Sequence, residues 1–132
     1  MEKKTSVDYT VDNLDVTIRT LKIDDLAAVF HLGEKLFTHA KVPNLYYVWD
    51  EYEVVNFFRN DAPFCLVAVA EDRIVGFLLA TIIDKRNSPR KYGYIVWLGV
   101  APDYRKKGIG SRLFEECRKL MVEEKVRMLL VD

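Results

Sequence analysis

Residues 105–111 (RKKGIGS) have the types and the spacing to bind a phosphate group. Three basic side chains stand directly before two glycines, and an amphipathic segment follows at once. The first amides of a helix have no partner within the helix and the helix dipole is positive there, so a helix that starts here would hold anions through its backbone. The glycines leave out Cβ atoms at the point of closest approach, and the basic side chains add positive charge.

The segments on either side of this turn favour a strand before it and a helix after it. Residues 92–100 (YGYIVWLGV) are aromatic and β-branched, as in a buried strand, and Pro102 ends any ladder that would continue. Apolar residues then recur at helical spacing: Ile109, Leu113, Cys117, Leu120 and Met121. Strand, glycine turn and helix follow in the order that an anion site needs. The alternative is a tight turn whose basic side chains are only solvated.

These residues resemble the coenzyme A signature of the GNAT superfamily of N-acetyltransferases. That signature is Arg or Gln, two residues, Gly, one residue, then Gly or Ala, and Arg105, Gly108 and Gly110 match it without a gap. The spacing from Val100 through Pro102 to Arg105 is also typical of the family. The glycine fingerprint of dinucleotide-binding domains and the Gly-Lys-Ser or Gly-Lys-Thr of a P-loop do not occur in the sequence. The resemblance implies an N-acetyltransferase that uses acetyl-CoA as co-substrate.

The rest of the chain is predicted to supply the elements that position this turn. After a polar tail we predict a strand over 16–20, a helix from Asp24 or Asp25 to Phe37 that the aspartates cap, and a helix over 51–59. The later elements are strands over 64–70 and 74–83 joined by a hairpin turn at 71–73, the strand that ends at Val100, the helix from 109, and a strand over 126–131.

This order, β-α-α-β-β-β-α-β, agrees with the resemblance. The implied fold class is α/β (α+β), a GNAT-like mixed, mostly antiparallel twisted sheet with helices on both faces. Because 132 residues suffice for one core, we predict a single domain over 1–132.

Charge and hydropathy argue against several partners. The chain has 20 basic and 20 acidic side chains and a net charge of zero, so it has no bulk attraction to nucleic acid or to an anionic membrane. No segment has the ~18 uninterrupted apolar residues of a membrane span, and the charged N-terminus lacks the apolar region of a signal peptide. We therefore expect a cytoplasmic protein.

The cysteines and histidines give no metal signature. Cys65 and Cys117 fall within a predicted strand and on the apolar face of a predicted helix, where cysteine behaves as a small hydrophobe. His31 and His39 lack the i, i+4 spacing of a helical ligand pair. We therefore predict no metal, and the implied acetyl transfer needs neither cysteine as a nucleophile.

The resemblance also implies which residues form the site. The CoA site would consist of Leu98, Gly99, Val100, Arg105, Lys106, Lys107, Gly108, Ile109, Gly110 and Ser111. The backbone of Leu98 and Val100 would pair with pantetheine amides, and the Val100 amide is a candidate donor to the oxyanion. Tyr94 stands where some members carry a glutamate base, so that base is absent. Asp132 is an alternative carboxylate, or else a solvated acid.

The acceptor side is expected between the first two helices. Tyr46, Tyr47 and Trp49 lie beside the acidic residues Asp50, Glu51 and Glu53. Aromatic walls with carboxylates suit a cationic amine or a peptide N-terminus. The alternative is that these aromatics fasten the helices to the sheet.

In the family, a further helix and two strands follow the strand predicted at 126–131. The sequence given stops at Asp132, so we expect an incomplete domain, a short natural protein, or a partner chain that completes the sheet. Residues 126–132 would then be covered by a second copy in a homodimer, or frayed. Three functions stay open: an active N-acetyltransferase, an acyl-CoA-binding regulatory module without turnover, and an unrelated nucleotide- or phosphate-binding domain.

Overall fold

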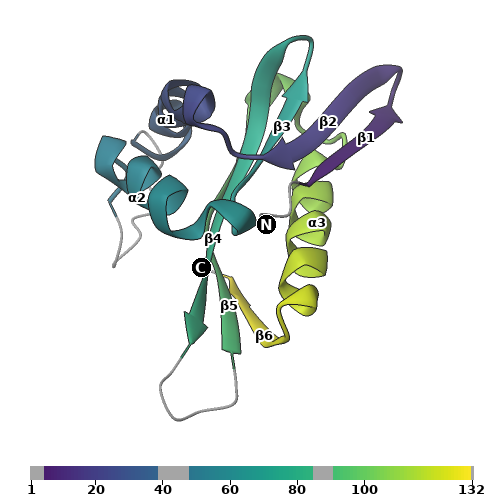
Figure 1. The fold of residues 1–132 in the computed structure, drawn as a ribbon. Helices are drawn as coiled ribbons and strands as arrows, with labels where there is room; N and C mark the ends of the chain where they lie inside the picture. Colours follow the sequence, from purple (N-terminus) through teal and green to yellow (C-terminus); the bar gives the residue numbers. More distant parts are fainter. Residues whose placement is uncertain (1–4, 39–47, 85–90, 132) are drawn as a thin grey trace.

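A computed structural model describes residues 5–38, 48–84 and 91–131 as a six-stranded sheet with helices on both faces (Figure 1). In chain order the elements are β1 (Ser6–Val11), β2 (Leu14–Thr20), α1 (Leu26–Gly33), α2 (Glu51–Asp61), β3 (Leu66–Ala70), β4 (Arg73–Asp84), β5 (Lys91–Val100), α3 (Ile109–Glu123) and β6 (Val126–Val131). The strands also lie in this order across the sheet. Strands β1 to β5 pair antiparallel and β6 pairs parallel with β5, so the predicted mixed, mostly antiparallel sheet is confirmed.

The predicted polar tail is wrong for residues 6–11, which form strand β1. Their partly buried side chains alternate with exposed ones, and Val7, Tyr9 and Val11 face inward. Asp12 and Asn13 both have positive φ, 50° and 63°, which matches the two-residue turn that joins twisted antiparallel strands. The observed order therefore has one more N-terminal strand than predicted.

The hairpin predicted at 71–73 is confirmed. Glu71 and Asp72 have φ of 52° and 60°, and Ala70 pairs with Arg73, so the connection is a two-residue turn of the same kind. This hairpin holds β3 and β4 at the centre of the sheet.

Asp25 is the N-cap residue of α1 as predicted, but its side chain bonds the chain before the helix rather than the first amides of α1. Its carboxylate accepts hydrogen bonds from Arg19 Nη1 at 2.6 Å, from Arg19 Nη2 at 3.0 Å and from the Lys22 amide at 2.8 Å. Burial alone would raise the pKa of Asp25, but these hydrogen bonds and the Arg19 charge outweigh it and lower the pKa. The residue thus ties β2 to the chain entering α1.

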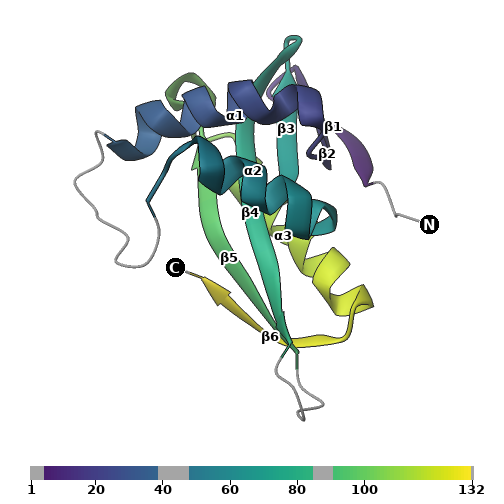
Figure 2. The same ribbon diagram turned by 60° about the vertical axis from the view of Figure 1, so that its left-hand side comes forward.

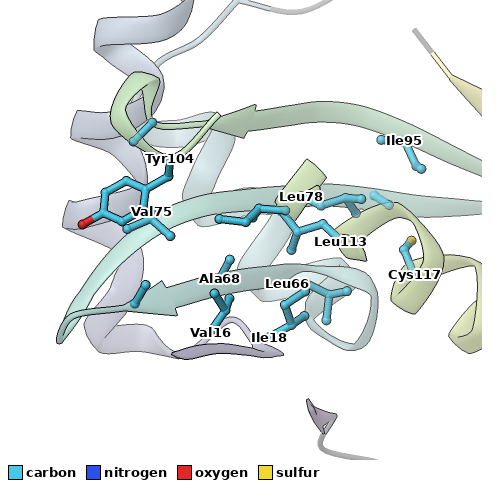
Figure 3. Packing of buried hydrophobic residues seen from close by; sticks show 14 of the residues in the cluster. Val16, Ile18, Leu66, Ala68, Val75, Leu78, Ile95, Tyr104, Leu113 and Cys117 are labelled. Atoms are coloured by element: carbon cyan, nitrogen blue, oxygen red, sulfur yellow. The ribbon is translucent and has the colours of Figure 1, made fainter. Parts of the chain in front are cut away.

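The sheet separates two apolar cores. The core beneath α3 contains side chains from β2 to β5 and from the helix, and Figure 3 shows Tyr104 at one end of it and Cys117 at the other. The core beneath α1 and α2 contains Trp49, Phe77 and Trp97. Figure 2 shows α1 and α2 together on one face of the sheet and α3 on the other. The predicted placement of helices on both faces is confirmed.

Within the described ranges, none of the helices has the length and hydropathy that a bilayer crossing requires.

Candidate functional site

A cleft of about 850 Å³ opens where the end of β5 meets the start of α3 and the end of β6. Figure 2 shows β6 diverging from β5 toward its C-terminal end. Pairing between the two strands begins at Lys91 with Val126 and its last pair is Ile95 with Val131. Within the described part of the chain, β6 pairs with residues 91–95 of β5 and leaves the edge of residues 96–100 uncovered.

The backbone of Leu98 and Val100 faces this open edge. The Ala101 amide donates to Val75 O of the neighbouring strand β4 at 2.7 Å, so residue 101 turns its backbone toward β4. Successive residues of a strand turn their backbone groups to opposite sides, so those of Val100 and Leu98 point the other way. In agreement, Val100 O accepts a hydrogen bond from Arg105 Nε at 3.2 Å. The two residues expected to pair with pantetheine thus present amides and carbonyls to the cleft.

The glycine turn brings the start of α3 to the same cleft. Gly108 is the N-cap of α3 and has φ of 75°, a left-handed conformation that glycine adopts without strain. The Arg112 amide is bonded to Gly108 O at 3.0 Å, so the amides of residues 109–111 precede the first intrahelical bond. A Cβ atom on Gly108 would meet no atom within 4 Å, and one on Gly110 would lie 3.7 Å from Val100 Cγ2. The helix start is therefore open to a ligand.

The three basic residues of the turn are not equivalent. Arg105 and Lys106 line the cleft, and Lys106 has a positive φ of 65°. Lys107 lies outside the cleft, and its Nζ is 3.6 Å from a carboxylate oxygen of Asp12 in the β1–β2 turn. The structure thus places two of the three predicted cations beside the α3 amides.

Tyr104 anchors the turn to the central hairpin. Its hydroxyl donates to Glu71 Oε1 at 2.7 Å, and the Arg73 guanidinium carbon lies 5.5 Å from the centre of its ring. Only 8% of Tyr104 is exposed, and its ring also lines the cleft. The turn is therefore held by packing and by a hydrogen bond before any ligand arrives.

A β-bulge at Val96 decides which face of the sheet Tyr94 occupies. Leu79 pairs with Trp97 and Ala80 with Ile95, so Val96 is an extra residue on β5. Val100 packs against the core beneath α3, and Leu98, two residues earlier on the strand, shares its face; Tyr94 packs against the core beneath α1 and α2. Tyr94 is only partly buried there.

Sequence reasoning missed the apolar wall of the cleft, which Leu36 and Phe37 form. The helix predicted to end at Phe37 would place both residues in regular α-helical turns. They lie instead in a π-helical turn, Glu34–Thr38, which continues from α1. Such turns are frequent at functional sites. A sign in the sequence is Gly99, because a glycine within a strand often marks the close approach of another segment. In the structure, a Cβ atom on Gly99 would lie 2.6 Å from Leu36 Cδ1.

Trp49 belongs to the core rather than to the cleft. It is 7% exposed, its indole nitrogen donates to Phe30 O at 3.0 Å, and its ring stacks on Phe77 at 5.4 Å. This position favours the alternative that Trp49 fastens the helices to the sheet. Tyr46, Tyr47 and Asp132 lie outside the described residues.

Both cysteines are buried and free. Burial raises the pKa of the Cys117 thiol to about 12 and also raises the pKa of Cys65. A thiol in this state is a poor nucleophile. Among the residues of known position, no group of three or more His, Cys, Asp or Glu side chains could hold a metal ion.

Comparison with known proteins agrees with this geometry. The model of the acetyltransferase (GNAT) family matches residues 27–132. One solved structure of similar fold is the NatC complex bound to Gag peptide and CoA, with 21% identity, a TM-score of 0.73 and coverage of 88% of this chain and 72% of that chain. A second is the aminoglycoside N-acetyltransferase AAC(6')-Iy in complex with CoA, with 18% identity, a TM-score of 0.72 and coverage of 94% and 80%.

A third is a ribosomal-protein-alanine N-acetyltransferase from Brucella melitensis biovar Abortus 2308, with 18% identity, a TM-score of 0.70 and coverage of 89% and 79%. A search of curated protein sequences gives no match. At these identities the structural likeness shows the fold alone, whereas the family match spans most of the chain and includes the whole cleft turn. The chain belongs to the GNAT family of acetyltransferases.

Proposed function

We propose that this protein transfers an acetyl group from acetyl-CoA to a primary amine of a small molecule, a lysine or a protein N-terminus. The amine attacks directly within a ternary complex. One observation carries the proposal: the uncovered edge of β5 and the open start of α3 face the same cleft. A strand edge suits the amides of pantetheine, and a helix start suits a diphosphate.

In this proposal the diphosphate binds the amides of residues 108–111, with Arg105 and Lys106 beside it. The pantetheine arm then runs along Leu98 and Val100 toward the bulge at Val96. Gly99, between them, pairs with Phe77 of β4. Because it has no side chain, Leu36 can lie directly over the strand at this point. Lys107 contributes less than Arg105 and Lys106 to diphosphate binding, because its Nζ lies beside the Asp12 carboxylate.

The chemical step is an exchange of a C–S bond for a C–N bond. The amine nitrogen attacks the thioester carbonyl carbon, and the resulting oxyanion accepts a hydrogen bond from a backbone amide of β5, for which we propose Val100. One such donor contributes about 10²- to 10³-fold in rate. The C–S bond then breaks, CoA leaves as the thiolate, and the amine proton passes to a base.

Two residues are proposed for the proton steps. Tyr94 stands where some family members carry a glutamate base, so a proton role here would fall to its phenol; it lies on the α1 and α2 side of the sheet and is not among the residues that line the cleft. Asp132 follows the end of β6. The variants Tyr94→Phe and Asp132→Asn each remove one titratable group. The variant that removes a limb of the pH profile of kcat/KM identifies the residue that takes or gives the proton.

The state of the cysteines supports direct attack over a covalent acyl-enzyme. Cys65 and Cys117 are buried, and burial raises the pKa of both thiols. Neither lines the cleft. A thiolate nucleophile would need the opposite environment.

The test is thiol release from acetyl-CoA measured over a panel of amines and peptides. Initial rates with both substrates varied should give intersecting double-reciprocal lines, as a ternary complex requires. Parallel lines would contradict direct attack. Acetyl-CoA binding without thiol release for any acceptor would favour a regulatory module, and a preference for ATP over CoA would refute the site. A cytoplasmic location and a homodimer through β6 stay predictions.

A further inference from the structure

The cleft has two chemically different halves. Its polar half holds Arg105, Lys106 and the start of α3, and its apolar half holds Phe37, Val96 and Trp97, with Leu36 over Gly99 between the two halves. Because the last β5–β6 pair is Ile95 with Val131, the apolar half is also the closed end. From Val100 to Val96 the strand covers about 13 Å at ~3.3 Å per residue. A ligand anchored by its phosphates at α3 would therefore point its other end at the apolar half.

Leu36 rests directly on the strand because residue 99 is glycine. A Cβ atom on Gly99 would come within 2.6 Å of Leu36 Cδ1 and within 3.3 Å of two carbons of the Phe77 ring. The π-helical turn that carries Leu36 also turns the adjacent Phe37 toward the same face, where both line the cleft. The two side chains thus form a continuous wall over β5.

The wall is held rigidly from behind. The Phe37 ring lies 4.8 Å from the ring of Trp97, 5.2 Å from that of Trp49 and 6.0 Å from that of Phe77. Both indole nitrogens are bonded: Trp97 Nε1 donates to Glu53 Oε2 at 2.8 Å, and Trp49 Nε1 donates to Phe30 O. A side chain packed on satisfied, stacked rings has little room to yield.

We propose that Leu36 and Phe37 limit the length of the acyl group, so that the enzyme uses acetyl-CoA in preference to acyl-CoA with longer chains. This inference rests on the proposed function, because a thioester carbonyl at the Val100 amide would place the acyl group beside Gly99, against Leu36 and pointing toward Phe37. Each further methylene of the acyl chain meets a fixed side chain instead of displaceable water. Overpacking of this kind is unfavourable even where the added group is apolar.

The experiment compares Leu36→Ala with wild type on acetyl-, butyryl- and hexanoyl-CoA, with one amine acceptor. We expect the kcat/KM ratio of butyryl- to acetyl-CoA to rise tenfold or more, the usual effect of one or two methylenes in an apolar pocket. Val122→Ala is the matched control, because Val122 is an exposed aliphatic residue on α3 that does not line the cleft. Leu36→Val serves as a milder variant if the alanine variant is unstable, with a smaller rise expected.

Two results would overturn the inference while leaving the proposed function intact. One is a wild-type enzyme that uses hexanoyl-CoA as efficiently as acetyl-CoA. The other is a Leu36→Ala enzyme with an unchanged acyl ratio and a raised KM for the amine, which would assign the wall to the acceptor. Failure of wild type to bind or use any acyl-CoA would instead refute the proposed function. Calorimetric binding of the three acyl-CoA compounds separates these cases without turnover.

Discussion

Replacing both glycines of the helix start by alanine should weaken CoA binding without unfolding the protein. The double variant Gly108→Ala/Gly110→Ala places two methyl groups beside the amides proposed to hold the diphosphate. Nothing within 4 Å would obstruct the new atom at residue 108, and the one at residue 110 makes an ordinary contact with Val100 at 3.7 Å. Any loss of affinity therefore arises at the helix start itself, from ligand access or from backbone strain at residue 108, rather than from a damaged core.

The stability terms of the two substitutions oppose each other. Gly108 has φ of 75°, and a side chain in the left-handed region costs about 1–2 kcal/mol. Gly110 lies within α3, where alanine is favoured over glycine by about 0.8–1.0 kcal/mol. The free energy of unfolding should thus fall by about 1 kcal/mol or less. A hydrogen bond to a charged phosphate contributes about 1.5–3 kcal/mol, so losing one lowers affinity by about 10- to 150-fold.

The assay is isothermal titration with CoA and with pantetheine, accompanied by a thermal melt. Pantetheine lacks the diphosphate, so its affinity should be the same for wild type and the double variant while that for CoA falls. Unchanged CoA affinity in a folded double variant would refute the assignment of the diphosphate to this turn. Equal losses for CoA and pantetheine would show that the cleft itself had been distorted.

Three further predictions follow from other contacts. Lys106→Ala should lower CoA affinity more than Lys107→Ala in the same titration, because Lys106 lines the cleft and Lys107 lies by Asp12; the reverse order would show that Lys107 swings to the phosphates. Asp25→Asn should lower the free energy of unfolding in urea by about 2 kcal/mol at pH 7, through loss of charged hydrogen bonds to Arg19. Because the folded pKa of Asp25 is lowered, its stabilisation is fully present above the unfolded value of about 3.9 and is lost as the pH falls through the folded value. The difference in the free energy of unfolding between wild type and Asp25→Asn should therefore become smaller in acid. A difference that does not change with pH would show that the ionisation of Asp25 is not coupled to folding. Finally, Cys65 and Cys117 should resist alkylation in the native protein and react on unfolding, since both are buried with raised pKa; rapid native labelling together with loss of turnover would reopen a covalent mechanism.

The strand, turn and helix of the site were predictable because each leaves a local signal. The apolar run that ends at Val100, the proline after it and the two glycines report backbone requirements directly. The hairpin at 71–73 was equally local. Strand β1 could have been found by the same reasoning, since Val7, Tyr9 and Val11 alternate with polar residues before the turn at Asp12 and Asn13.

Other features depend on contacts between different elements of the fold. Asp25 looked like a helix cap, but Arg19, six residues earlier on β2, recruits its carboxylate. Lys107 lies outside the cleft that Arg105 and Lys106 line, and its Nζ lies beside Asp12 instead. Asp12 is 95 positions earlier in the chain and meets Lys107 only in the folded sheet. No local pattern encodes either choice.

The bulge at Val96 shows why counting along a strand fails near the site. With strict alternation, Tyr94 would share a face with Leu98 and Val100. The extra residue instead places Ile95 in the core beneath α3 and Trp97 in the core beneath α1 and α2, so Tyr94 lies on the face opposite Leu98 and Val100. The same irregularity lies just beyond the last β5–β6 pair, at Ile95 and Val131. A bulge bends its strand and strengthens the local twist, so the residue that confuses the sequence pattern also helps to open the edge on which the proposed chemistry depends.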